Sequence, residues 1–345
     1  NKVLLSVLIL LILNNCSAGK KVGFWDKVDE NVPQIENTKT ILTKQVKLEE
    51  EFNSNLYVKI SNGKFKQNNL NNQNDTGELA YEGVLEKIGK YNFSKFNDFD
   101  FISPNPLFYN KNLVFYDNKG AITFYDENQK TLWKNNFYNK NEKKIKPRLN
   151  FAVKNNTLIV TDDVAKYYAI NIETGELLWK KTNIVPFNSN IKIKDNVFYV
   201  VDYKNILRSI SIQDGSEIWN LKTEESLTKS NTKISIALDE KNIYFNNSIG
   251  DITAVDIKSG QLVWQLPTQN NNISQNAFQL SNSELVINEN TVFFSNNKNE
   301  FYSIDTKTGL INWKNEISSD LKPIVIGKLI ITISEKGYLY VVDKK

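Results

Sequence analysis

One short pattern containing tryptophan recurs along this chain and limits the folds that it can adopt. It reads "ETGELLWKK" (173–181), "QDGSEIWNL" (213–221), "KSGQLVWQL" (258–266) and "KTGLINWKN" (307–315). The tryptophans are Trp133, Trp179, Trp219, Trp264 and Trp313, which lie 46, 40, 45 and 49 residues apart. A period of about 40 to 50 residues is typical of folds built from one repeated supersecondary unit.

Each unit contains a predicted β-hairpin ahead of its tryptophan. Two runs rich in β-branched and aromatic residues flank a turn, which is the composition of paired strands. These hairpins span residues 113–126, 158–171, 197–211, 243–256 and 292–305. A glycine four residues before the tryptophan supplies the positive φ of a tight turn, at Gly175, Gly215, Gly260 and Gly309. Gln129 stands at this position in the first unit, so we expect its turn to be distorted.

The repeat resembles that of a known family. The stretch "AVDIKSGQLVW" (254–264) is similar to AxDxxTGxxxW, the repeat of pyrroloquinoline-quinone (PQQ)-type β-propellers, with Ser in place of Thr. "AINIETGELLW" (169–179) and "SIDTKTGLINW" (303–313) match it with one substitution each. The resemblance covers residues 100–345 and implies an all-β propeller of four-stranded blades. It also implies that each of the five tryptophans docks on an adjacent blade, where a large flat side chain fills the space between repeats.

The repeats predict a domain organisation. Residues 100–345 hold five complete blades and the beginning of a sixth, and the relatives suggest about eight blades in the complete protein. "KLIITISEKGYLYVVDKK" (328–345) repeats the hairpin but ends before the next tryptophan would occur, so we expect a truncated C-terminus. Residues 19–99 predict a tether, a polar loop and atypical N-terminal strands. Within them, "KQNNLNNQNDTG" (66–77) is too polar to bury anything.

The first 18 residues are interpreted as a signal peptide. Lys2 precedes "VLLSVLILLIL" (3–13), whose eleven residues suit the apolar region of a signal and are fewer than the roughly 20 of a membrane-spanning helix. Leu13-Asn14-Asn15-Cys16 resembles a bacterial lipobox, although Asn15 replaces the usual small residue. We therefore predict lipidation of Cys16. The alternative is ordinary cleavage after Ala18, which would leave a soluble periplasmic protein.

Composition excludes several classes of function. The 43 Lys and Arg against 39 Asp and Glu give a net charge of only +4, without the concentrated basic face of a nucleic-acid binder. There is no histidine and only one cysteine. Ser-His-Asp and Cys-His catalysis, histidine metal sites and an intramolecular disulfide are therefore excluded. Acid–base chemistry by paired carboxylates remains possible.

Two functional classes share the PQQ-type repeat. Quinoprotein dehydrogenases hold PQQ and calcium, commonly with a cysteine pair or a histidine near the cofactor, and this chain has neither. The BamB-like lipoproteins of outer-membrane β-barrel assembly bind partners and perform no chemistry. The signal segment, Cys16 and the lack of long insertions favour this second class. Fragments of a dehydrogenase and exported propellers that bind another protein or a glycan remain alternatives.

The resemblance to the second class implies a non-enzymatic scaffold that is anchored in the outer membrane and faces the periplasm. Its expected partner is the β-barrel assembly protein. We expect no catalytic residue, cofactor, metal, nucleic acid or small-molecule substrate.

Two charged motifs have structural interpretations that we prefer. "KKIKPR" (143–148) is a basic cluster that could bind phosphate, but its place between a tryptophan strand and the next blade favours a solvated connection. The pair Asp162 and Asp163 could bind a cation, but it falls in a predicted hairpin turn, where Asp is common.

Overall fold

The computed structural model describes residues 71–76, 89–91, 106–225, 233–268 and 280–345. The predicted signal peptide and Cys16 lie outside these residues. Every described residue belongs to one compact unit of the chain, within residues 58–345. In the described ranges, no helix is long and apolar enough to cross a membrane.

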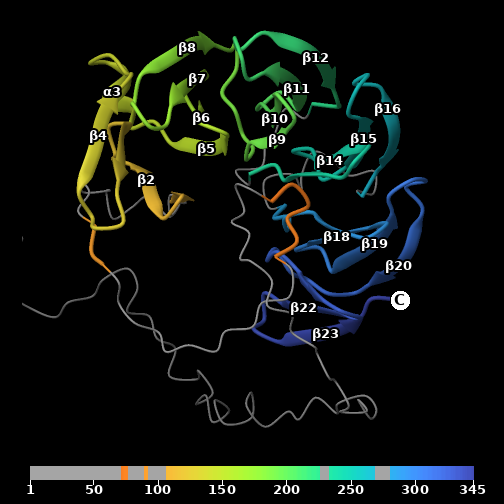
Figure 1. The fold of residues 1–345 in the computed structure, drawn as a ribbon. Coiled ribbons are helices and arrows are strands. Elements are labelled where there is room, and N and C mark those ends of the chain that lie inside the picture. Colours follow the sequence, from red (N-terminus) through yellow and green to blue (C-terminus); the bar gives the residue numbers. More distant parts are fainter. Residues whose placement is uncertain (1–70, 77–88, 92–105, 226–232, 269–279) are drawn as a thin grey trace, which may run out of the picture. The chain divides into compact units, whose positions relative to one another are not determined.

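Six antiparallel sheets follow one another along the described chain, each made of consecutive strands (Figure 1). The first contains β1 (Leu107–Tyr109), β2 (Asn112–Tyr116), β3 (Ala121–Tyr125) and β4 (Thr131–Asn136). The second contains β5 (Leu149–Lys154), β6 (Thr157–Asp162), β7 (Lys166–Asn171) and β8 (Leu177–Thr182). The third contains β9 (Lys192–Lys194), β10 (Val197–Val201), β11 (Ile206–Ser211) and β12 (Glu217–Lys222).

The remaining sheets repeat this plan. The fourth contains β13 (Ile236–Leu238), β14 (Asn242–Asn246), β15 (Ile252–Asp256) and β16 (Leu262–Leu266). The fifth contains β17 (Val286–Asn288), β18 (Thr291–Asn296), β19 (Glu300–Asp305) and β20 (Ile311–Asn315). The sixth has three strands, β21 (Ile324–Ile326), β22 (Leu329–Ile333) and β23 (Leu339–Asp343). The second and third strands of the first five sheets are the hairpins predicted from the sequence, so that prediction is confirmed. The short helix α3 (Glu142–Ile145) lies between the first two sheets.

The core is divided among the junctions between sheets. Each of five clusters of buried apolar side chains draws its members from two successive sheets. The central strands of the inner sheets are therefore buried on both faces, as in β6, β14 and β18, because a sheet lies on either side. A strand covered on both faces needs a continuous apolar run, which explains the runs of Val, Ile, Phe and Tyr in the hairpins.

A β-bulge recurs beside each tryptophan. The register between the third and fourth strands of the first five sheets shifts by one residue at the same place, such as Ala254/Val255. In that sheet Ala254 pairs with Trp264 while Val255 pairs with Leu262, so the bulge contains the extra residue Val263. The extra residue leaves Leu262 and Val263 exposed, whereas Trp264 is buried.

Candidate functional site

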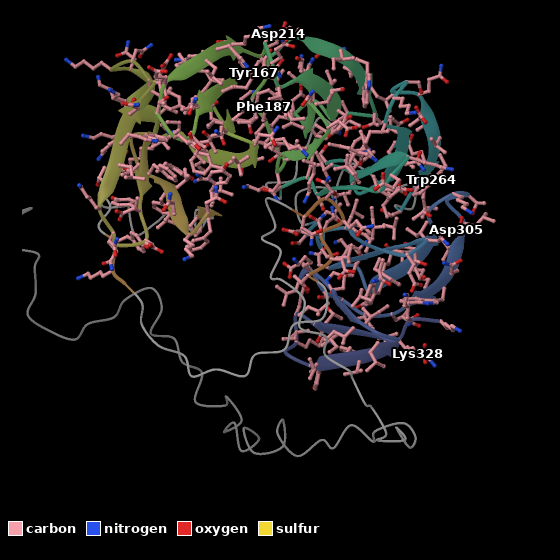
Figure 2. The ribbon with its side chains drawn as sticks, viewed as in Figure 1. Tyr167, Phe187, Asp214, Trp264, Asp305 and Lys328 are labelled. Atoms are coloured by element: carbon pink, nitrogen blue, oxygen red, sulfur yellow. The ribbon has the colours of Figure 1, made fainter. Side chains whose placement is uncertain are left out.

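The tryptophans lie at the junctions between successive sheets. Trp264, at the end of the fourth sheet, donates a hydrogen bond from Nε1 to the carbonyl oxygen of Thr306 at 2.9 Å. Thr306 follows Asp305, where β19 ends, and Figure 2 shows Trp264 and Asp305 close together. The indole also lies against Gly309, where an added Cβ would be 2.6 Å from Cδ2 of Trp264. This tryptophan therefore joins its own sheet to the turn of the next.

The same contact repeats along the chain. Trp133 Nε1 donates to Ile172 O (2.7 Å), Trp179 to Ile212 O (2.8 Å) and Trp313 to Lys344 O (3.1 Å). Trp219 packs against Gly260, where an added Cβ would lie 2.5 Å from its Cδ2. The turn glycines have φ values of +76°, +69°, +70° and +72°, for Gly175, Gly215, Gly260 and Gly309 respectively. The five tryptophans thus lie at five different junctions.

The turn of the first sheet differs from the others by its length. In the later sheets the turn glycine donates to a carbonyl four residues earlier, as Gly175 does to Asn171 at 2.8 Å. Gln129 donates to Asp126, three residues earlier, at 3.0 Å. It keeps a positive φ of +67°, although it is not glycine. Its side chain accepts a hydrogen bond from Lys90 N at 2.9 Å, so residues 89–91 lie against this turn.

A polar segment contacts the first strands of three sheets, and this contradicts the expectation that residues 66–77 bury nothing. Asn72 O accepts a hydrogen bond from Leu238 N of β13 at 2.7 Å, and Gln73 O accepts one from Ile287 N of β17 at 2.9 Å. Asn72 Nδ2 donates to Ile193 O of β9 at 2.8 Å. We call residues 71–75 the central segment (orange in Figure 1). The expectation was wrong because amide side chains can be buried when backbone groups satisfy them.

Asn74 is the most completely satisfied residue of the central segment. It is 2% exposed, and its Nδ2 donates to Ile236 O of β13 (2.9 Å) and to Leu285 O just before β17 (2.8 Å). Its φ is +58°, which Asn tolerates better than most residues. Its Oδ1 accepts a hydrogen bond from Lys192 Nζ, and so does Asn71 O.

Lys192 is a buried cation in the first strand of the third sheet. The residue is 1% exposed. Burial lowers its pKa to about 7, while the carboxylate of Glu284 raises that pKa and the ammonium of Lys322 lowers it further. The Lys192 side chain therefore bonds to the central segment at a cost in desolvation. Nothing in the local sequence "NIKIKD" distinguishes Lys192 from the neighbouring Lys194, which is why sequence reasoning missed it.

The last strand of each four-stranded sheet is a candidate surface for a partner. Within the described ranges, β4, β8, β12, β16 and β20 each pair with a strand on one side only. These strands, and the residue just before β20, carry exposed apolar side chains ahead of the tryptophan. We call them the outer-strand surface: Leu132, Leu177, Leu178, Ile218, Leu262, Val263, Leu310 and Ile311, which are 42–68% exposed. An edge strand of this kind can accept a further strand from another chain.

The predicted Asp162–Asp163 turn has a structural explanation. Asp162 is buried, and its Oδ1 accepts hydrogen bonds from Val164 N (2.9 Å) and Lys166 N (2.7 Å). Tyr138 donates to the other oxygen. Burial raises the pKa of this carboxyl to about 6, partly offset by those hydrogen bonds. In the described part of the chain, no group of three or more Asp, Glu, Cys or His side chains is arranged to hold a metal ion.

The repeated sheets and their tryptophan contacts define the class: this is a β-propeller protein of the PQQ-type repeat. The family model described as "Outer membrane protein assembly factor BamB" matches residues 118–345. The chain belongs to that family.

Individual proteins are also similar to this chain, in sequence or in fold. The chain is 25% identical over 171 residues to outer membrane protein assembly factor BamB of Francisella tularensis, covering 47% of this chain and 35% of that protein. It spans about a third of the length of the curated relatives that it matches. The crystal structure of BamB from Moraxella catarrhalis has a similar fold, with a TM-score of 0.59, 15% identity, and 70% and 72% of the two chains covered. A europium-containing methanol dehydrogenase shares the fold at a TM-score of 0.51 and 11% identity, covering 62% of this chain and 51% of its own.

Proposed function

We propose that this chain is a non-enzymatic scaffold of outer-membrane β-barrel assembly. The observation that carries the proposal is the family match over residues 118–345. The partner proposed is the β-barrel assembly protein. A lipid on Cys16 would anchor the chain in the outer membrane, facing the periplasm.

The outer-strand surface suits a binding role. Each edge strand presents unpaired backbone donors and acceptors beside one or two exposed apolar side chains, such as Leu177 and Leu178 on β8. An added strand would gain main-chain hydrogen bonds from the edge and selectivity from the side chains. The five tryptophan contacts hold these edges on a packed core, so a partner would meet a preorganised surface.

A membrane anchor would make modest affinity sufficient. When two components are held at one membrane, their encounter is intramolecular in effect and their effective concentration rises. Several acyl chains on the terminal cysteine would hold the protein stably, whereas one chain gives only marginal binding.

Site-specific photocrosslinking in membranes tests the proposal. A photoreactive residue at Leu178 should capture a β-barrel assembly component, whereas the same residue at Lys154, an exposed position at the end of β5, should capture less. Cys16→Ser should lower the capture, because it removes the anchor but leaves the sheets unchanged. Capture of an unrelated protein alone, or equal capture from both positions, would contradict the proposal.

The alternative, a quinoprotein activity, is tested separately. Purified protein supplied with PQQ and calcium should oxidise alcohols and sugars no faster than a protein-free control. Stoichiometric PQQ binding with turnover would mean that the chain is an enzyme, and it would overturn the scaffold proposal.

A further inference from the structure

A cavity of about 460 Å³ lies beside α3, between the first two sheets along the chain. Its walls are formed by Asn118 and Lys119, from the turn between β2 and β3, and by Lys140, Lys143, Lys144 and Lys146 around α3. Two segments separated by about twenty residues of sequence thus bring five lysines to one cavity. Folding therefore adds Lys119 to the basic run that the sequence already contains.

The ammonium groups of these five lysines form no ion pair with any described residue. The nearby carboxylates are already engaged. Glu142 pairs with Lys166, and Asp117 pairs with Lys134 at 3.4 Å. Asp163 accepts a hydrogen bond from Arg148 N at 2.8 Å. The cavity therefore carries a concentrated positive charge in a chain whose net charge is only +4.

We propose that this cavity binds a phosphate-bearing anion. Like charges gathered around a small volume repel one another, and an anion in the cavity relieves that repulsion. A lysine ammonium is a compact cation with three donors, and it is a common ligand of phosphate oxygens. The convergence of the side chains on one cavity suits a compact anion better than an extended acidic peptide, which would need a row of charges.

Such a phosphate could belong to a lipid headgroup or be free in solution. Ile145 lies within the lysine run and is 66% exposed. An apolar side chain beside several lysines is the composition of segments that lie at the surface of an anionic membrane. Lysines near such a surface are attracted to its anionic headgroups, so the lipid source predicts a large effect of charge reversal.

Vesicle flotation and phosphate titration distinguish the two sources. The full chain carrying Cys16→Ser, which removes any attached lipid, is mixed with phosphatidylcholine vesicles with and without phosphatidylglycerol. The Ile145 methyl signals are followed by NMR in a parallel titration with inorganic phosphate. Lys143→Glu with Lys144→Glu should weaken the interaction about tenfold or more. The paired control, Lys328→Glu with Lys336→Glu, changes net charge equally at exposed positions in the turns between the strands of the sixth sheet.

Each outcome bears on the proposal. Binding only to phosphatidylglycerol vesicles, lost in the Lys143/Lys144 variant and kept in the control, supports a lipid headgroup. Saturable Ile145 shifts with phosphate but no vesicle binding support free phosphate. Equal losses in both variants would mean that diffuse net charge alone attracts anions, which overturns the proposal, as would no binding to either probe. A variant with Lys143→Arg and Lys144→Arg should keep the binding that the glutamate variant loses. That result would show that the anion requires positive charge at these positions.

Discussion

Two kinds of contact join the sheets of this protein, and they differ in chemistry and in number. At the tryptophan junctions, an indole from one sheet packs against the turn of the next and donates one hydrogen bond, and the arrangement repeats with the sequence. At the central segment, backbone and amide groups contact the first strands of three sheets, and a buried lysine from one of those strands bonds to the segment. This arrangement occurs once among the described residues. Apolar packing can be repeated because it requires only shape, whereas a buried polar contact requires every donor to find its acceptor.

The largest expected effect is loss of a tryptophan junction. Trp264→Ala removes a side chain that is 9% exposed and its hydrogen bond to Thr306, so it should lower the free energy of unfolding by about 3–5 kcal/mol. Leu262→Ala changes a half-exposed side chain on the same strand and should cost roughly 0.5–1 kcal/mol. Urea unfolding measures both. Equal midpoints for the two variants would mean that the junction contributes little.

A turn glycine should matter nearly as much as its tryptophan. Gly260→Ala imposes a Cβ on a residue with φ of +70° and places it 2.5 Å from Trp219, so about 2–4 kcal/mol should be lost. Gly337 has φ of +81° but no atom within 4 Å of an added Cβ. Gly337→Ala should therefore cost only the backbone strain, about 1 kcal/mol. Similar losses in thermal unfolding for both variants would contradict the steric contact.

At the central segment, the expected effect is smaller and depends on one amide. Asn74→Ala leaves Ile236 O and Leu285 O without their donor and should cost about 2 kcal/mol. Gln73→Ala is the matched control, because the Gln73 side chain is exposed and its contact to Ile287 uses only the backbone. That control should change stability by roughly 0.5 kcal/mol or less. Hydrogen exchange of the Leu238 and Ile287 amides should increase in Asn74→Ala alone, and unchanged exchange would show that the segment is held elsewhere.

The last expected effect is a dependence of stability on pH, carried by one buried ammonium group. The folded-state pKa of Lys192 is lowered by burial from 10.5 to about 7. Between these pH values the unfolded chain binds a proton that the folded chain has lost, so stability rises with pH from about 7 towards about 10. Below about pH 7 both states hold the proton and the folded state carries the full desolvation cost. Lys192→Met should remove this rise, measured as the difference between urea midpoints of the two proteins across that range. Parallel plots of urea midpoint against pH for the two proteins would contradict a contribution from Lys192.

The tryptophan junctions could be predicted from sequence because each is made by elements at a regular spacing. Each repeat contains a hairpin, a turn glycine and a tryptophan four residues after that glycine. This pattern predicts strands, turns and a docking surface without knowledge of distant contacts. The bulge that exposes Leu262 and Val263 was not predicted, because a register shift depends on the pairing of two strands.

The sequence by itself determined the repeated unit: strands, turns and the tryptophan that joins one sheet to the next follow from periodic local patterns. Only the tertiary structure decided what the non-repeating residues do. Asn74 is buried because Ile236 and Leu285, 162 and 211 residues away, offer it carbonyl oxygens. Lys119 joins the lysines around α3 because a hairpin brings it there. Polar and charged side chains obtain their roles from partners that only folding brings within reach, and no local pattern encodes those distances.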